Sequence, residues 1–126
     1  PRDMLKYGQL YLDGGTWNGR RILSAEWIAE SWKKYGRLEP IDRNGHEYGY
    51  LWWHHVYEVG GDSIATVEAR GNGGQYVFVV PSLDMVVVIT SGNFRNGRLR
   101  QPEEIMGKWI LPSAVGADHG TGSRVQ

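Results

Sequence analysis

A glycine-rich segment, Gly71-Asn72-Gly73-Gly74-Gln75, combines residue types and spacing that could do chemistry. Glycine lacks a Cβ, so the backbone here could approach a ligand closely and point N–H groups at an anion or an oxyanion. A plain turn between two strands is the alternative interpretation. A dinucleotide-binding fingerprint is excluded, because Tyr76 stands in place of its last glycine and a strand, not a helix, is expected to follow.

A second segment, Ser31-Trp32-Lys33-Lys34, matches the pattern Ser-x-x-Lys. In that pattern a lysine one helical turn away takes the proton from a serine nucleophile. The pattern is short, and Ser31 falls on the aromatic face of an ordinary amphipathic helix, where Lys34 can simply be solvated. We therefore expect the match to be a coincidence.

The histidines and acidic pairs give no further site. His54 and His55 are neighbours in an expected strand, so their side chains point to opposite faces and cannot bind one metal ion together. Glu103 and Glu104 suit the first turn of a helix, where carboxylates complement the helix dipole. The chain has no cysteine, which excludes disulfides, thiolate zinc sites and a cysteine nucleophile. No metal and no cofactor is expected.

An aromatic segment, Tyr48 to Trp53, could line a pocket for a sugar ring or an acyl group. Aromatic side chains are also what the core of a sheet requires, and that is the preferred interpretation. Alternation along a strand predicts that one of Trp52 and Trp53 is buried and the other is more exposed.

Length and charge limit the class of protein. A chain of 126 residues with 40% hydrophobic and 22% charged residues is one folded domain. Its 14 basic and 14 acidic residues balance, so nucleic acid is not an expected partner. No apolar run is long enough for a membrane span, and the cellular compartment stays open.

The elements that must position these residues begin with helices. Apolar spacing predicts a helix over residues 2–13, a tight turn at Trp17-Asn18-Gly19-Arg20, and a second helix capped by Ser24 and ended by Gly36. On the second helix an apolar face is expected, made by Trp27, Ile28, Ser31, Trp32 and Tyr35.

Residues 36–47 are loop by composition, and a strand pattern follows. We expect strands over residues 48–56, 63–69, 75–80 and 85–90. The last two are joined by Pro81 to Asp84 as a hairpin, and their apolar character indicates burial on both faces, with helices on both sides.

A polar loop over residues 93–100 and a final helix complete the domain. That helix begins at Pro102 and has an apolar stripe of Ile105, Met106, Trp109 and Ile110. The domain thus spans residues 1–111, and residues 112–126 are expected to be a polar tail or arm.

Six motifs occur in an order that resembles the C-terminal portion of the beta-lactamase superfamily of serine hydrolases. That superfamily includes class C beta-lactamases, penicillin-binding peptidases, esterases and 6-aminohexanoate-dimer hydrolases. The resemblance covers residues 2 to about 111. The motifs are Arg2-Asp3-Met4-Leu5-Lys6-Tyr7-Gly8, Trp17-Asn18-Gly19, Ile22-Leu23-Ser24-x-x-Trp27, Tyr48-Gly49-Tyr50-x-Trp52-Trp53, Gly71-x-Gly73-Gly74-Gln75 and Pro81-x-Leu83-Asp84-x-Val86-Val87-Val88.

The resemblance implies site residues. It places the family's third motif, usually Lys-Thr-Gly or His-x-Gly, at Gly71, Asn72 and Gly73, where backbone N–H groups form half of an oxyanion hole without a side-chain cation. Substrate contacts are expected at Gly74, Gln75, Tyr50 and Trp52. The family's Ser-x-x-Lys and Tyr-x-Asn motifs have no counterpart here, because Ser31 falls in a later helix of the resemblance and the chain holds no Tyr-x-Asn.

The resulting expectation is a partial beta-lactamase-like α+β fold. It has an antiparallel sheet of three to four strands, two N-terminal helices and one C-terminal helix. The function expected is that of the C-terminal part of a hydrolase that transfers an acyl group from an ester, amide or lactam to water, inactive by itself. The alternative is a non-catalytic binding or assembly module that uses the aromatic sheet. The expected partner is a second copy of the chain in a homo-oligomer, or the missing N-terminal segment.

Overall fold

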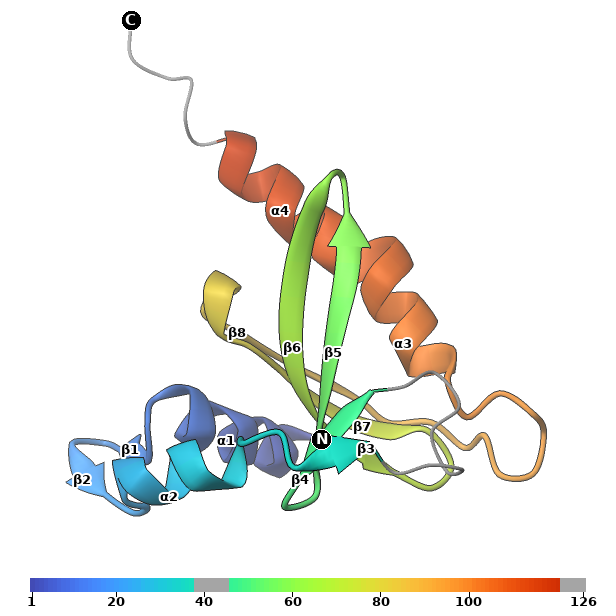
Figure 1. Cartoon of the computed structure of the whole chain (residues 1–126). Coiled ribbons are helices and arrows are strands. Elements are labelled where there is room, and N and C mark those ends of the chain that lie inside the picture. Colours follow the sequence, from blue (N-terminus) through green and yellow to red (C-terminus); the bar gives the residue numbers. More distant parts are fainter. Residues whose placement is uncertain (38–45, 121–126) are drawn as a thin grey trace, which may run out of the picture.

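The chain folds as an α+β unit built on a six-stranded antiparallel sheet (Figure 1). The computed structural model describes residues 1–37 and 46–120, of which residues 37 and 117–120 are described by their backbone alone. The strands follow one another in the sheet in chain order: β3 (Gly36–Arg37), β4 (Glu47–Gly49), β5 (Trp52–Val59), β6 (Asp62–Gly71), β7 (Gln75–Val80) and β8 (Met85–Ile89). The expected α+β class with an antiparallel sheet is confirmed.

The sheet has more strands than the three or four expected. The aromatic segment expected as one strand over residues 48–56 divides at Tyr50 and Leu51, whose φ angles of 44° and 71° reverse the chain between β4 and β5. Residues 36–47, expected as loop, contribute β3 and the start of β4, while residues 38–45 lie outside the described part. The strands expected over residues 63–69, 75–80 and 85–90 match β6, β7 and β8.

One face of the sheet carries the N-terminal helices. α1 (Arg2–Leu12) matches the expected helix, and a two-residue turn at Asn18 and Gly19 joins β1 (Thr16–Trp17) to β2 (Arg20–Arg21). α2 (Ala25–Ser31) begins at Ser24, whose Oγ accepts a hydrogen bond from the Trp27 N–H at 3.0 Å. The helix ends at Ser31 rather than Gly36, so Tyr35 lies beyond it, and Trp27 is 45% exposed rather than part of a buried face.

The other face is covered by one long C-terminal helical run. It consists of α3 (Gln101–Ile105), a π-helical turn η2 (Met106–Ile110) and α4 (Leu111–Gly120). In the π turn the Leu111 N–H donates to the Met106 carbonyl, one residue farther back than in an α-helix. Residues 112–120 are thus helical instead of a polar tail, while residues 121–126 lie outside the described part.

The π turn explains two departures from the expected pattern. Proline inside a helix clashes with the preceding turn, and a widened turn directly before Pro112 gives it room. The wider turn also displaces later side chains around the helix axis, so Met106 is fully buried while Trp109, expected on the same stripe, is 69% exposed.

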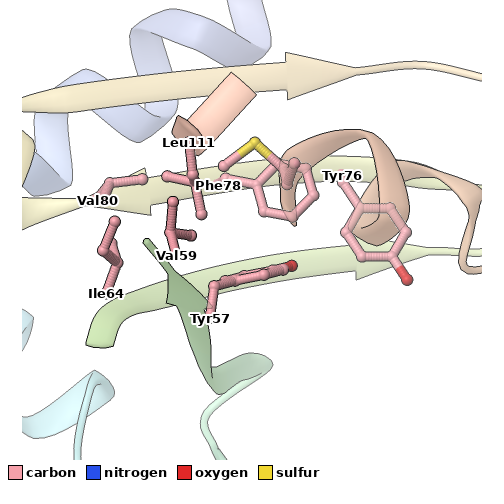
Figure 2. Packing of buried hydrophobic residues seen from close by; sticks show 8 residues of the cluster. Tyr57, Val59, Ile64, Tyr76, Phe78, Val80 and Leu111 are labelled. Atoms are coloured by element: carbon pink, nitrogen blue, oxygen red, sulfur yellow. The ribbon is translucent and has the colours of Figure 1, made fainter. Parts of the chain in front are cut away.

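The sheet therefore has a core on each face. On one face, Tyr57 and Phe78 of the sheet are buried in one cluster with Leu111 of α4 (Figure 2). Met106 of η2 belongs to the same cluster. The opposite core holds Tyr11, Ile28, Trp52, Val67, Val77 and Val79. β7 is buried on both faces as expected, whereas β8, at the rim of the sheet, is half-buried. A short 3₁₀ turn, η1 (Pro81–Leu83), and Asp84 join these two strands in the expected hairpin.

Candidate functional site

Two segments of the expected site lie at one end of the sheet, together with the loop that follows β8. The pairing of Trp53 with Glu68 and of Gly71 with Gln75 places the turn at Tyr50-Leu51 beside the turn at Asn72-Gly73-Gly74. Tyr76 pairs with Ile89, so the loop that follows β8 leaves the sheet at this same end. The structure thus brings Tyr50 and the glycine-rich turn to one rim.

The glycine-rich turn is held by the loop that follows β8. Gly73 and Gly74 have φ angles of 81° and 82°, a region that L-residues rarely adopt. The Ser91 Oγ donates to the Gly73 carbonyl at 2.9 Å and is 2.7 Å from the Gly74 carbonyl, and the Asn93 N–H donates to the Gly73 carbonyl at 2.9 Å. The Gln75 amide donates to the Ser91 carbonyl.

Space as well as backbone conformation requires glycine in this turn. A Cβ on Gly73 would collide with the Phe94 ring, and one on Gly74 would collide with the Ser91 Oγ. By contrast, Gly97 has a similar φ of 75° with open space around its Cα. The two buried glycines therefore let the loop pack directly on the turn, while Gly71 and Asn72 stay exposed.

The N–H groups assigned to an oxyanion hole are partly engaged. The Gly73 N–H donates to the Asn72 Oδ1 at 2.9 Å, a local bond that occupies the expected donor. To bind an oxyanion, this N–H has to exchange the Asn72 side chain for the ligand. The role of Gly71, Asn72 and Gly73 as backbone donors stays a prediction.

The two aromatic residues expected to touch substrate have different surroundings. Tyr50 is 52% exposed and contacts Trp27 and Tyr35, with ring centroids 5.6 and 5.2 Å away. Trp52 is 2% exposed and lies among Tyr7, Tyr11 and Trp32, with ring centroids 4.8 to 5.9 Å away. Trp52 is part of the core and leaves no open face for a ligand, whereas Tyr50 is accessible.

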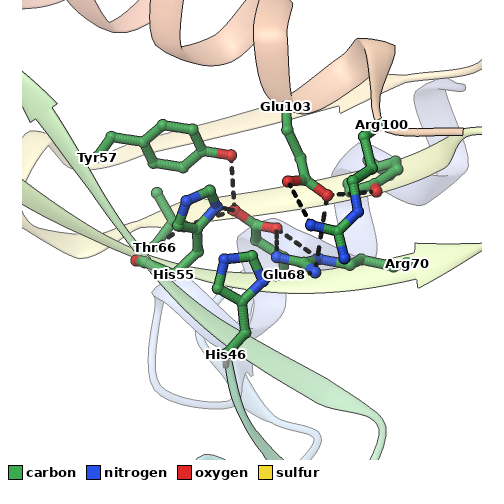
Figure 3. Close-up of polar contacts among 9 residues, drawn as sticks. His46, His55, Tyr57, Thr66, Glu68, Arg70, Arg100 and Glu103 are labelled. Carbon is green, nitrogen blue, oxygen red and sulfur yellow. Dashed lines mark hydrogen bonds and ion pairs between the residues drawn. The ribbon is translucent and has the colours of Figure 1, made fainter. Parts of the chain in front are cut away.

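Between the sheet and the C-terminal helical run lies a buried group of polar residues, the Glu68 cluster (Figure 3). At its centre Glu68 is fully buried and its Oε2 accepts a hydrogen bond from the Arg70 Nε at 2.7 Å. Its Oε1 accepts hydrogen bonds from the Tyr57 hydroxyl at 3.0 Å and the Thr66 hydroxyl at 2.7 Å. The cluster consists of His46, His55, Tyr57, Thr66, Glu68, Arg70, Tyr76, Arg100 and Glu103.

Arg70 links the sheet to the C-terminal helical layer. Its Nη1 lies 3.7 Å from the Glu103 Oε1 and 3.0 Å from the His46 Nδ1, and its guanidinium stands 5.1 Å from the centre of the Trp53 ring. Its side chain is only 10% exposed. Arg70, which precedes the glycine-rich segment in the chain, is therefore turned inward and away from a ligand on the turn.

Glu103 has a structural partner rather than only the dipole role expected for it. It is 8% exposed, and its Oε1 accepts a hydrogen bond from the Tyr76 hydroxyl at 2.7 Å. The Arg100 Nη1 lies 3.9 Å from its Oε2. The cluster thus holds two carboxylates and two guanidiniums, which offset one another's charge in a site with little water.

The ionisation of the cluster follows from these contacts. Burial raises the pKa of Glu68, but the neighbouring His55 and the Arg70 charge lower it, and the net result is a pKa below the ordinary value. Burial raises the pKa of Tyr57, as does the charge of Glu68. Burial and the bond to Glu103 likewise raise the pKa of Tyr76. Glu68 therefore stays ionised while both phenols keep the protons that they donate.

Sequence reasoning missed the Glu68 cluster, although a signal was present. Thr66, Glu68 and Arg70 recur at every second position of one strand, which places three polar side chains on the same face. The partners Tyr57, Tyr76 and Glu103 come from three other elements, and no local pattern connects them.

Ser31 and Lys34, the two residues of the Ser-x-x-Lys match, contact other groups and not each other. Ser31 is 1% exposed, and its Oγ donates to the Ile28 carbonyl at 3.0 Å. Lys34 lies beyond the end of α2, and its Nζ forms an ion pair of 2.8 Å with the Glu47 Oε2. Neither group is free to act on the other.

His54 and His55 point to opposite faces of the sheet, as expected. His55 faces Glu68, with Nδ1 3.5 Å from the Oε1, while burial and the nearby Lys34 charge lower the pKa of His54 on the opposite face. Within residues 1–37 and 46–120, no group of three or more acidic or histidine side chains could hold a metal ion. In the same part of the chain, no helix is both long and apolar enough to cross a membrane.

Comparison with known proteins adds no assignment. No protein-family model matches the chain, and no curated protein matches it. The functional interpretation therefore depends on the motifs and on the geometry described above.

Proposed function

We propose that this chain is the C-terminal part of a beta-lactamase-like serine hydrolase, supplying scaffold and backbone donors but no nucleophile. One observation carries the proposal. The turn of residues 71–74 stands at one end of an antiparallel sheet that is covered by helices on both faces, and Tyr50 lies at the same end. This arrangement suits acyl transfer, in which backbone N–H groups stabilise the oxyanion that forms when a serine attacks a carbonyl carbon.

Four of the six described serines support inactivity of the chain by itself. The hydroxyls of Ser31, Ser91 and Ser113 donate to main-chain carbonyls, and that of Ser63 donates to the Glu58 carboxylate. None of these bonds joins a serine to the lysine or histidine base that activates a nucleophile. Without attack there is no oxyanion, and the donors alone cannot catalyse hydrolysis. The substrate class proposed for the complete enzyme is an ester, amide or lactam.

Intact mass of the pure chain after incubation with a fluorophosphonate or a penicillin tests this proposal. We expect no adduct, while an authentic serine hydrolase in the same reaction is modified completely. A stoichiometric adduct on the chain would overturn the proposal of inactivity. Its loss in Ser31→Ala would then assign the nucleophile to Ser31.

A second test addresses the family. We expect the coding DNA upstream of the Pro1 codon to encode, in frame, a helix with Ser-x-x-Lys followed by a Tyr-x-Asn motif. A start codon directly before Pro1 with neither motif in frame would contradict the proposal.

A non-catalytic binding or assembly module is the second candidate function. It is favoured by the exposed aromatic group around the β4–β5 turn, where Trp27, Tyr35 and Tyr50 are 45%, 56% and 52% exposed and Leu51 is 77% exposed. Exposed apolar surface of this kind is typical of interaction sites. Light scattering that shows a clean monomer at high concentration would count against this candidate.

A further inference from the structure

We propose that Asn96 is a site of spontaneous deamidation, at which the folded loop promotes attack of the Gly97 main-chain nitrogen on the Asn96 side chain. This inference goes beyond the proposed function and does not rest on it. The reaction takes place within the loop that follows β8, so it requires no residue outside that loop. Its only co-reactant is water.

The reaction replaces a side-chain amide by an acid in two steps. In the first, the Gly97 nitrogen bonds to the Asn96 Cγ, the Cγ–Nδ2 bond breaks, and the proton of the attacking nitrogen passes through water to the departing ammonia. The product is a five-membered succinimide ring. In the second step, water adds to one of the two ring carbonyl carbons and the bond from that carbon to the nitrogen breaks. Opening at the side-chain carbon gives aspartate, and opening at the main-chain carbon gives isoaspartate.

The sequence alone does not select this asparagine. The chain contains four Asn-Gly pairs, and the missing Cβ of glycine leaves the nitrogen of each pair open to attack. Asn44-Gly45 lies outside the described residues, and the other pairs begin at Asn18, Asn72 and Asn96. Residues 18–20 and 96–98 are the same tripeptide, Asn-Gly-Arg. A difference in rate between these two sites therefore reflects the structure around them.

The structure holds the reacting groups of Asn96 in place. The Asn96 Oδ1 accepts a hydrogen bond from the Arg98 N–H at 3.0 Å, which folds the side chain back over the peptide bond to Gly97. Among the described residues the Gly97 N–H donates no hydrogen bond, and nothing lies within 4 Å of a Cβ built on Gly97. The Arg98 N–H also stabilises negative charge that develops on the Oδ1 during attack. The loop thus supplies proximity, an accessible nucleophile and an oxyanion donor.

Asn72 lacks this combination. The Gly73 N–H, whose nitrogen would have to attack, already donates to the Asn72 Oδ1 at 2.9 Å. The Gly73 carbonyl accepts from the Ser91 Oγ, and the Phe94 ring packs directly against the Gly73 Cα. Rotation of this peptide toward a succinimide would break those contacts, so we expect slow reaction at Asn72.

Asn18 is restrained in a different way. Asn18 and Gly19 form the two-residue turn between β1 and β2, with φ angles of 48° and 74°. The pairing of Trp17 with Arg20 fixes the main chain on both sides of the turn. Among the described residues the Asn18 side chain makes no hydrogen bond, so its Cγ is not held near the Gly19 nitrogen. We expect this pair to react slowly as well.

Deamidation at Asn96 would act on the loop that holds the glycine-rich turn. The Asn96 Nδ2 donates to the Asn93 Oδ1 at 3.2 Å, and the Asn93 N–H donates to the Gly73 carbonyl at 2.9 Å. Aspartate at position 96 loses the first of these donors, and isoaspartate lengthens the main chain of the loop by one carbon atom. The modification therefore alters the contacts that fix the turn.

Peptide mapping tests the ranking of the three sites in one sample. The folded chain is incubated in mildly alkaline buffer and digested with chymotrypsin, and mass spectrometry detects replacement of –NH2 by –OH in each Asn-Gly peptide. We expect the Asn96 peptide to convert at least about tenfold faster than the Asn18 and Asn72 peptides. In guanidinium chloride, which unfolds the chain, the two Asn-Gly-Arg peptides should convert at similar rates.

The matched control is Asn96→Gln, because glutamine keeps an amide but has to close a larger ring. Its peptide should show no conversion over the same time. Three results would each overturn the proposal: conversion at Asn96 no faster than at Asn18 in the folded chain, an equal advantage of Asn96 in the unfolded chain, or unchanged conversion in Asn96→Gln. None of them bears on the serine-directed adduct, so the failure of this inference and that of the proposed function are distinguishable.

Discussion

Two hairpin turns at the same end of the sheet both contain left-handed backbone, but they place different residue types there. The β6–β7 turn uses Gly73 and Gly74 at φ angles of 81° and 82°, and the β4–β5 turn uses Tyr50 and Leu51 at 44° and 71°. Left-handed backbone costs an L-residue roughly 1–2 kcal/mol, and glycine avoids that cost. The glycine turn is buried under a loop, whereas the bulky turn displays its side chains to solvent.

The comparison shows what each turn is built to do. Glycine at 73 and 74 allows a close approach by Phe94 and Ser91, so this turn is fixed by the loop that follows β8. The left-handed backbone at Tyr50 and Leu51 is not accompanied by close contacts of this kind, because both side chains are exposed. Such backbone strain is commonly found at functional positions. We expect the first turn to resist change and the second to tolerate it.

The largest effect should come from the Glu68 cluster, the buried charges that lead into the glycine turn along β6. Arg70→Met leaves the Glu68 carboxylate buried without its closest cation, and the expected loss is about 3–5 kcal/mol in the free energy of unfolding. Urea denaturation measures this loss. The matched control Arg20→Met, at an exposed arginine, should change it by less than about 0.5 kcal/mol. Equal effects of the two variants would show that the cluster does not support the fold.

Gly73→Ala should be the next most severe change. It combines the left-handed backbone with a collision against the Phe94 ring, for an expected loss of about 2–4 kcal/mol. Gly97 also has a positive φ, but the space around its Cα is open. Gly97→Ala should therefore lower the free energy of unfolding by only about 1 kcal/mol. Thermal melting of both variants measures the difference, and its absence would mean that the loop does not pack on the turn in solution.

Acidification should destabilise the fold through the Glu68 cluster. The pKa of Glu68 is lowered in the folded chain, so its contribution to stability is fully present above its unfolded pKa of about 4.3 and is lost as the pH falls through the folded value. Each unit of lowering corresponds to about 1.4 kcal/mol. In Glu68→Gln, unfolding measured between about pH 6 and pH 3 should depend less on pH than in the wild type. An unchanged slope would assign the acid sensitivity to other carboxyl groups.

The smallest expected effect has the opposite sign. Leu51→Gly relieves left-handed backbone at a side chain that is 77% exposed, so the free energy of unfolding should rise by up to about 1 kcal/mol. Chemical denaturation measures this change. The control Gly60→Ala introduces a side chain at a φ of 59° in open space, so its free energy of unfolding should fall. A destabilised Leu51→Gly would show that the leucine side chain makes contacts that outweigh the strain.

The sequence by itself determined the local elements and the general class. Apolar periodicity defined α1 and three of the long strands, Ser24 marked the start of α2, and the glycines between residues 71 and 74 marked a turn. These features depend on neighbours a few residues apart, so a linear pattern contains them. The absence of cysteine and the balanced charge likewise needed no structure to interpret.

Only the tertiary structure decided where those elements meet and which polar groups become buried between them. The Glu68 cluster gathers side chains from separate strands and from the C-terminal helical run, and burial makes ionisable groups interdependent only after they are packed together. The division of one aromatic segment at Tyr50 and Leu51 and the helical course through Pro112 both contradict local preference. In each case the buried neighbour, Trp52 after the turn and Leu111 before the proline, fixes the course of the chain against the propensity of the exposed residue. Sequence alone could not predict that burial.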